Sequence, residues 1–257
     1  ISVDNAVDIP KKSADIVWLE KDLMILEQGI LAGRKVFGNT MKYIKATTSS
    51  NFGNVFSVLL ASLFLPFLPM LPIQLLFLGL LYEISSMSIP WDNMDHEYLQ
   101  EPKKWEAESI ERFMYWFGPT SSIFDITTFL ITYFYIAPSV AGGSYYSLSP
   151  EQQVVFIGVF HSVWFIISLW TQTLVLYALR TPKVPFVESR PSFIMTTITS
   201  LGLVVGSVAP YTKLGNILGL EALPASAWWL LLFTATAYFI LVQMIKNIYV
   251  KKYGDLL

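Results

Sequence analysis

The sequence predicts an all-α polytopic membrane protein with six transmembrane helices, preceded by a short cytoplasmic segment that holds a strand and a stalk helix. Of the 257 residues, 54% are hydrophobic and only 14% are charged, which is too apolar for a soluble domain of this length. A membrane-spanning helix needs about 20 mostly apolar residues. Six stretches qualify, at about 52–70, 72–89, 113–136, 154–179, 193–209 and 228–245.

The stretch before the first span has the pattern of a small cytoplasmic element. Residues 13–20, SADIVWLE, alternate as a short strand does, and residues 30–44 carry apolar side chains at helical spacing. No helix stop signal lies between Lys45 and the first span. We therefore expect one helix to run from the cytoplasm into the membrane.

The connection between the first two spans is short and rich in proline. Pro66, Pro69 and Pro72 interrupt the apolar run, and proline breaks or kinks a helix. The sequence predicts a tight hairpin in which the first two spans are neighbours.

The distribution of Lys and Arg residues predicts how the chain is oriented in the membrane. With the six spans placed as above, 16 of the 17 Lys and Arg residues fall on the side of the N-terminus, and Lys213 alone falls on the other. Basic residues favour the cytoplasmic side of a membrane protein. Both termini are therefore expected to be cytoplasmic, with the loops at 137–153 and 211–227 outside.

Composition also limits the chemistry. The chain contains no cysteine, and its net charge is only −2. Thiolate catalysis, disulfides and soft thiolate ligands are excluded, so a metal handled here is expected to be a hard cation that prefers oxygen. The small net charge gives no reason to expect nucleic acid as a partner. The chain begins at Ile1 and is expected to be a piece of a longer protein.

Three polar residues of the first two spans form the candidate cation site. Glu83 lies inside an apolar span, where an ionisable group is costly and marks function; a carboxyl paired with neighbours or protonated is the alternative. Asn51 and Asn54 are three residues apart and share a helical face, where hydrogen bonding between helices is the alternative. Their oxygens and the Glu83 carboxylate are predicted to lie at similar depth. Mg²⁺ suits such a site, because it takes oxygen ligands and retains water.

The remaining polar residues near the spans are interpreted more simply. Asp125 lies among small hydroxyl residues and is expected to pack helices together. His161 and Gln172 are expected to make hydrogen bonds between helices. Asp92 and Asp95 follow the second span and are expected to cap or solvate a loop; steering of cations is the alternative.

Two long motifs resemble the cation-transporting P-type ATPases. MKYIKATTSSNFGNVFSVLLASLFLPFLPMLPIQLLFLGLLYE (41–83) is similar to the fifth and sixth membrane spans of that family, and IPWDNMD (89–95) continues the match. Residues 1–39 resemble the end of the phosphorylation domain and the stalk. SSNFGN, FLPFLPMLP, GPTSSIFD (118–125) and KKYG (251–254) point to the bacterial magnesium-transporting members. The resemblance covers essentially the whole chain.

This resemblance implies a domain plan and a role. Residues 1–28 would end the phosphorylation domain, 29–48 would form the stalk helix, and 49–254 would form the transmembrane domain. The longer pump would use ATP-Mg, form an aspartyl-phosphate and move Mg²⁺ into the cell across the bacterial inner membrane. The catalytic aspartate and the nucleotide-binding domain would lie before Ile1, so the partners implied are Mg²⁺, membrane lipid and the missing N-terminal part of the same pump. Oligomerisation stays open.

The same resemblance assigns the metal ligands. Asn51 and Asn54 match ligand positions of the fifth span, and Glu83 matches the acidic position of the sixth, where magnesium transporters more often have aspartate. Gly79 and Tyr82 replace ligand residues of the calcium pumps, which argues against two dehydrated calcium ions.

Three other interpretations stay open at this point. The protein could be a P-type pump for another cation, Ca²⁺ or H⁺. It could be an ATP-independent channel or secondary transporter that uses Glu83. The last four spans could serve only as a scaffold that contacts lipid.

Overall fold

The computed structural model describes residues 2–3, 12–15, 17–18 and 23–257. Strand β1 (Ser2–Val3) pairs in parallel with strand β2 (Val17–Trp18). Strand β2 lies inside the strand expected at 13–20, of which residues 16, 19 and 20 lie outside the described part. From Leu23 onward the secondary-structure elements are helices, and the fold is the all-α membrane protein that the sequence predicts.

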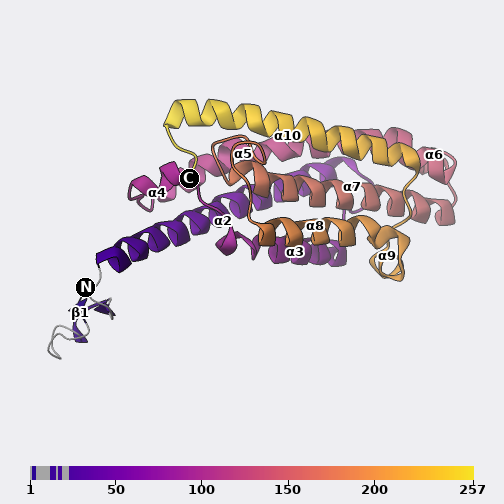
Figure 1. Ribbon diagram of the computed structural model, residues 1–257. Helices are drawn as coiled ribbons and strands as arrows, with labels where there is room; N and C mark the ends of the chain where they lie inside the picture. Colours follow the sequence, from indigo (N-terminus) through magenta and orange to yellow (C-terminus); the bar gives the residue numbers. More distant parts are fainter. Residues whose placement is uncertain (1, 4–11, 16, 19–22) are drawn as a thin grey trace.

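Helix α2 (Leu23–Phe64) is one continuous helix of 42 residues, which is about 63 Å at 1.5 Å per residue. As expected, it runs without a break from the segment before the first predicted span into the helical bundle (Figure 1); we keep the name stalk for its part before residue 49. It ends at Phe64 and not near residue 70. Proline disfavours helical backbone at the residue before it, so Pro66 ends the helix at this point.

The chain then turns through residues 65–71 into helix α3 (Pro72–Ser86). Pro72 is the first residue of α3, where a missing backbone N–H costs nothing. The short turn is confirmed, but the expected pairing of the first two spans is corrected. Helix α2 packs chiefly along α5 (Ala107–Ile131), whereas α3 packs against α7 (Pro150–Leu179) and α8 (Phe193–Val208). Helices α2 and α3 each pack against α7. Each of them therefore contacts α7 and a further helix more than it contacts the other.

The third span is longer than the sequence predicts. Helix α5 continues into the π-helical turn η2 (Thr132–Ile136) and then α6 (Ala137–Ala141). Short elements flank it: η1 (Ile89–Trp91), α4 (His96–Gln100) and η3 (Tyr145–Ser147). After α8 the chain forms η4 (Ala209–Tyr211), α9 (Lys213–Leu218) and α10 (Ala225–Tyr253).

Helix α7 is the central element of the bundle. It packs against α2, α3, α5, α6, α8 and α10, and in Figure 1 it runs through the middle of the bundle. Its side chains are apolar all round, which is the pattern of a helix buried on every side. Ser149 caps its first turn: the Ser149 hydroxyl accepts from the Gln152 N–H, and the Gln152 side chain accepts from the Ser149 N–H.

Five segments of the described residues are long and apolar enough to cross a membrane: Pro72–Trp91, Ala107–Ser147, Pro150–Leu179, Phe193–Tyr211 and Ala225–Tyr253. The predicted span at 52–70 is not among these five, because α2 ends at Phe64 and its residues around Asn51 and Asn54 are polar. That this end of α2 also crosses the membrane stays a prediction.

A buried polar network fixes the turn after α2 to the central helix. Gln74 donates to the Leu218 carbonyl at 2.7 Å and accepts from the Leu71 N–H at 2.8 Å. His161 Nε2 lies 2.8 Å from the Leu68 carbonyl and therefore donates to it, which leaves Nδ1 to accept from Gln74 at 3.2 Å. The hydrogen-bonding role expected for His161 is confirmed.

Helices α2 and α5 approach closely at a glycine. A Cβ atom added to Gly53 would lie 2.2 Å from the Ser121 hydroxyl and 2.7 Å from the Gly118 carbonyl. At Gly79 on α3, no heavy atom lies within 4 Å of the same position.

We predict that Gly53→Ala lowers the stability of the full-length protein by about 1–3 kcal/mol, the usual cost of overpacking, because the Gly118 backbone cannot move away without separating α2 from α5. Gly79→Ala is the matched control and is expected to leave stability unchanged. Thermal unfolding of both variants in detergent measures the difference. Equal unfolding midpoints for Gly53→Ala and wild type would contradict the close packing.

Candidate functional site

The three predicted cation ligands lie on two helices. Asn51 and Asn54 are on α2, with Asn51 exposed and Asn54 half-buried, and Glu83 is exposed in the last turn of α3. The Tyr43 hydroxyl donates to Glu83 Oε2 at 3.4 Å. All three side chains keep oxygen atoms that could receive a cation.

The structure places Asn54 and Glu83 in two different pockets. Asn54 lines a cavity of about 10 Å³ between α2, α5, α7 and α10, close to the volume that one water molecule needs. Glu83 lines a separate groove of about 440 Å³ between the stalk and α3. The two pockets share no lining residue. Convergence of the three residues on one ion therefore stays a prediction.

The cavity beside Asn54 contains polar atoms that lack partners. Ser49 and Gln172 line it together with Ser50 and Ser121. The Ser49 hydroxyl and the Gln172 amide nitrogen are buried and have no hydrogen-bond partner within the part of the chain that the structure describes. The interhelical hydrogen bond expected of Gln172 is therefore not made by this nitrogen. The cavity is polar but carries no carboxylate.

Asp125 connects two helices deep in the bundle. Its side chain is 2% exposed, and the Ser57 hydroxyl of α2 donates to its Oδ2 at 2.6 Å. This contact joins α5 to α2 beside the close approach at Gly53. It supports the helix-packing interpretation of Asp125.

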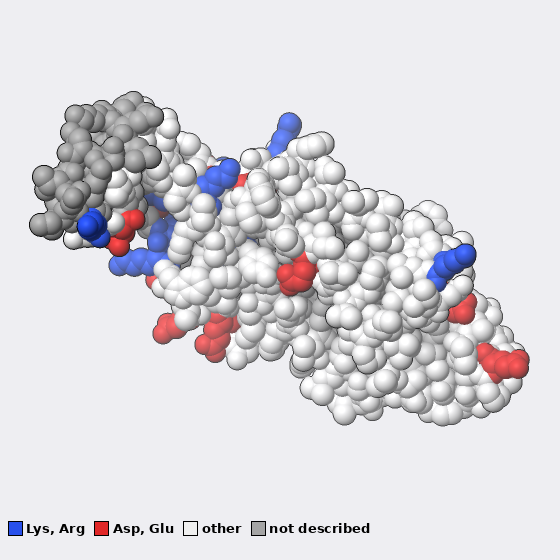
Figure 2. Space-filling view, turned by 90° about the horizontal axis from the view of Figure 1, so that it is seen from below, with Lys and Arg blue, Asp and Glu red and all other residues white. Residues whose placement is uncertain are grey.

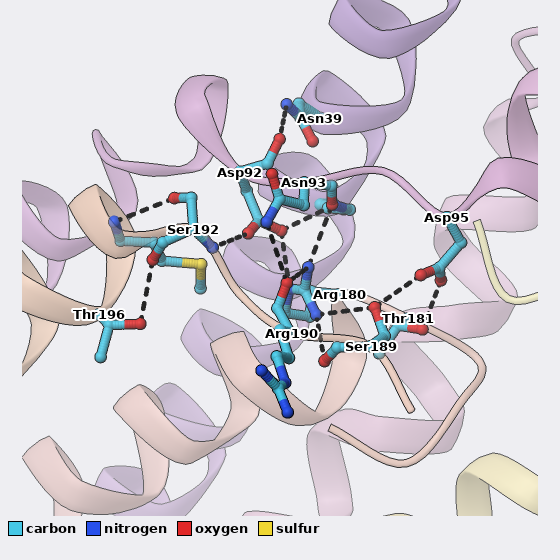
Figure 3. Close-up of polar contacts among 12 residues, drawn as sticks. Asn39, Asp92, Asn93, Asp95, Arg180, Thr181, Ser189, Arg190, Ser192 and Thr196 are labelled. Carbon is cyan, nitrogen blue, oxygen red and sulfur yellow. Dashed lines mark hydrogen bonds and ion pairs between the residues drawn. The ribbon is translucent and has the colours of Figure 1, made fainter. Parts of the chain in front are cut away.

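Asp92 differs most from its expected role. It is fully buried, so it neither solvates a loop nor faces incoming cations. Its Oδ2 lies 2.8 Å from Lys42 Nζ and 2.7 Å from Arg180 Nε, and its Oδ1 accepts from the Ser192 N–H at 3.0 Å. One carboxylate thus binds α2, the end of α7 and the start of α8, as Figure 3 shows for its partners Arg180 and Ser192.

The neighbours of Asp92 are bound to the same loops. Asn39 Nδ2 donates to the carbonyls of Pro90 at 3.0 Å and Asp92 at 3.1 Å. Asp95 is half-buried and accepts from Thr181 at 2.5 Å and Ser189 at 2.6 Å. The loops that follow α3 and α7 are therefore held together by hydrogen bonds as well as charge.

Burial shifts the pKa values of the charged groups in this cluster. Desolvation lowers the pKa of Lys42 to about 8, against a partial opposing effect of Asp92. Burial alone would raise the pKa of Asp92, but the charges of Lys42 and Arg180 outweigh it and hold that pKa below its usual value. Because the pKa of Asp92 is depressed on folding, its contribution to stability is present above the unfolded pKa and is lost as the pH falls through the folded pKa.

The sequence carries one signal for this cluster. Asp92 and Arg180 each lie just beyond a predicted span, and Lys42 precedes the first one, all on the same predicted side of the membrane. Two positive charges and one negative charge on the same side are a reason to expect an ion pair.

The surface agrees with a membrane domain that is charged at one end. Figure 2 shows Lys and Arg gathered toward the stalk end of one face, and a broad band beyond them with few charged side chains. These features define the class of protein: a helical membrane domain whose stalk helix is fixed to the loops of the bundle by buried charge.

The chain belongs to the family of cation-transporting ATPases, whose model for the C-terminus matches residues 67–248. It is 49% identical over 255 residues to a magnesium-transporting ATPase, P-type 1, of Salmonella typhimurium and 46% identical over 254 residues to the protein of that name in Escherichia coli. These alignments cover 99% of this chain and 27% of each relative. A calcium-transporting ATPase of Bacillus subtilis is 24% identical over 104 residues, 40% of this chain and 12% of that relative.

The family and these similarities agree with the resemblance drawn from the motifs. The chain spans about a quarter of the length of the magnesium-transporting relatives.

We predict that Asp92→Asn destabilises the full-length protein by about 3–5 kcal/mol, because removing one member of a buried ion pair leaves the other charges buried without a partner. The matched control is Glu97→Gln. Glu97 pairs with Lys183 at 2.8 Å on the surface, where an ion pair contributes about 0–1 kcal/mol. Thermal unfolding in detergent compares the two variants, and similar midpoints for both would show that the Asp92 cluster does not stabilise the fold.

Proposed function

We propose that this chain is the membrane part of a P-type ATPase that moves Mg²⁺ across the bacterial cytoplasmic membrane. The observation that carries the proposal is the similarity, over 99% of the chain, to relatives whose names state magnesium transport. The lack of cysteine and the amide and carboxylate oxygens of α2 and α3 fit a hard, hydrated cation.

The transported ion, in this proposal, binds to Asn51, Asn54 and Glu83 and to ligands that a span upstream of this chain supplies. The Asn51 and Glu83 side chains are exposed. Their oxygen atoms are therefore available to bind the ion together with ligands from helices outside this chain. The two pockets of Asn54 and Glu83 lie on helices that both pack against α7.

The rest of the pump cycle belongs to the longer protein. We propose that it forms an aspartyl-phosphate from ATP-Mg, imports Mg²⁺, and lies in the inner membrane with both ends of this chain in the cytoplasm. Residues 1–28 would end the phosphorylation domain. Helix α2 supports coupling between that domain and the ion, because its 42 residues form one rigid element from the stalk to Asn54.

We predict that Asn54→Ala and Glu83→Ala each raise the free Mg²⁺ concentration for half-maximal ATPase activity of the full-length pump by about tenfold or more, as loss of metal-site contacts does. ATP-Mg is held constant while free Mg²⁺ is varied. Asn216→Ala and Glu111→Ala, at exposed positions away from both pockets, are the matched controls.

If neither site variant changes the free Mg²⁺ concentration for half-maximal ATPase activity, Asn54 and Glu83 are helix-packing residues and not ligands of the transported ion. Stimulation of the wild-type pump by Ca²⁺, with none by Mg²⁺, would replace the magnesium proposal with a calcium pump. Each outcome is read from the same ATPase measurement.

A further inference from the structure

Residues 118–125 of α5, GPTSSIFD, pack against the turn of α2 that carries Asn54. A Cβ atom added to Gly118 would lie 2.5 Å from Cδ1 of the Phe52 ring. One residue further along α2, Gly53 lies against the carbonyl of the same glycine. The two residues of α2 immediately before Asn54 are therefore in close contact with this motif.

Two side chains of the motif form hydrogen bonds to α2 before and after Asn54. The Ser122 hydroxyl donates to the Gly53 carbonyl at 3.2 Å, and Asp125 Oδ2 accepts from the Ser57 hydroxyl at 2.6 Å. The three side chains that make these bonds are each at most 2% exposed, so bulk water does not compete for them. Asn54 thus lies between two positions of α2 that the motif holds.

Asp125 also prevents a hydrogen bond that would distort α2. A serine hydroxyl inside a helix can donate to the carbonyl four residues before it, and this bond tends to bend the helix. For Ser57 that carbonyl belongs to Gly53, and the Ser122 hydroxyl already donates to it. With Asp125 as its acceptor, Ser57 leaves the backbone of this turn undisturbed.

Asp125 acts on α2 as a hydrogen-bond acceptor. The salt bridges among the described residues do not include it, so it does not compensate a positive charge there. An amide oxygen can accept from a hydroxyl as a carboxylate does. Replacement by asparagine therefore preserves this contact, and replacement by alanine removes it.

Asn54 and the motif line the same cavity. Asn54 of α2 and Ser121 of α5 both line the cavity of about 10 Å³ that also borders α7 and α10. The Ser121 hydroxyl donates to the Gly118 carbonyl at 3.1 Å, so the motif fixes this part of the wall. A rotation of α2 against the motif would move the Asn54 amide relative to the cavity.

We propose that the GPTSSIFD motif positions the Asn54 side chain for the transported cation, with Ser122 and Asp125 as positioning residues that act through α2. This inference rests on the proposed function, in which Asn54 is a ligand. Residues that surround a metal ligand orient it and raise the affinity for the metal. Mg²⁺ demands near-ideal octahedral geometry, so a turn of α2 that is free to rotate binds it less tightly.

The test measures the free Mg²⁺ concentration for half-maximal ATPase activity of the full-length pump, with ATP-Mg held constant. Ser57→Ala and Asp125→Ala each remove one hydrogen bond from the turn that carries Asn54, and we expect this concentration to rise about threefold to tenfold. The maximal rate is expected to stay unchanged, because only binding of the ion is weakened. Ser62→Ala is the matched control: Ser62 is exposed on the same helix, and its hydroxyl donates to the Val58 carbonyl at 2.8 Å.

Two further variants separate positioning from packing. Asp125→Asn keeps an oxygen that accepts from Ser57, and it is expected to restore half-maximal activity at the wild-type Mg²⁺ concentration. The double variant Asn54→Ala with Ser57→Ala is expected to need no more free Mg²⁺ than Asn54→Ala alone, since residues that act through one contact are not additive.

Wild-type Mg²⁺ activation in Ser57→Ala and Asp125→Ala, with Asn54→Ala still shifted, would overturn this inference and leave the ion site standing. Shifts that multiply in the double variant would overturn it as well, because Ser57 would then act independently of Asn54. An unshifted Asn54→Ala would overturn the ion site itself, and this inference with it. Unfolding midpoints are measured for each variant, and if Asp125→Ala does not fold, Ser57→Ala decides.

Discussion

The buried carboxylate of Asp92 is the interaction on which the packing of α2, the loop after α3 and the end of α7 depends. It compensates Lys42 and Arg180, two cations that are nearly inaccessible to solvent. A buried charge is tolerated only when it is paired and hydrogen-bonded. Removal of Asp92 would leave two buried cations without their carboxylate partner, so this one side chain holds the stalk, the loop after α3 and the end of α7 together. This fixes the stalk relative to the helices that carry the candidate ion site.

Polar contacts hold the central helix at its C-terminal end and at one point in its interior. At one end, Lys246 Nζ of α10 donates to the carbonyls of Ala178, Thr181 and Lys183 at 3.0, 3.1 and 2.8 Å. An ammonium group at the C-terminus of a helix satisfies its free carbonyls and opposes the helix dipole. In the N-terminal half of α7, His161 binds the turn after α2. Because α7 packs against both α2 and α3, it sets the relative positions of the two helices that carry the candidate site.

The sequence predicts the helical membrane class, the continuous stalk and the turn at the prolines, because these follow from apolar length, helical spacing and the chemistry of proline. It does not predict which helices are neighbours. The pairing of α2 with α5 depends on the absence of a side chain at Gly53. A glycine in an apolar run does not indicate which helix packs against it. The burial of Asp92 depends on Arg180, 88 residues later, and local patterns cannot relate such distant positions. The candidate site shares this limit, since Asn51, Asn54 and Glu83 are identified by their polarity, whereas the pockets that Asn54 and Glu83 line depend on how distant helices pack.

The distance along the chain between Asp92 and Arg180 also has a consequence for biosynthesis. Asp92 leaves the ribosome long before Arg180, which is the last residue before the loop at 181–192. Until Arg180 and Ser192 have been synthesised, Asp92 has only Lys42 of its three partners, so the complete cluster cannot form. The first helices of the chain are thus free to adjust during insertion, and the arrival of Arg180 ends that freedom.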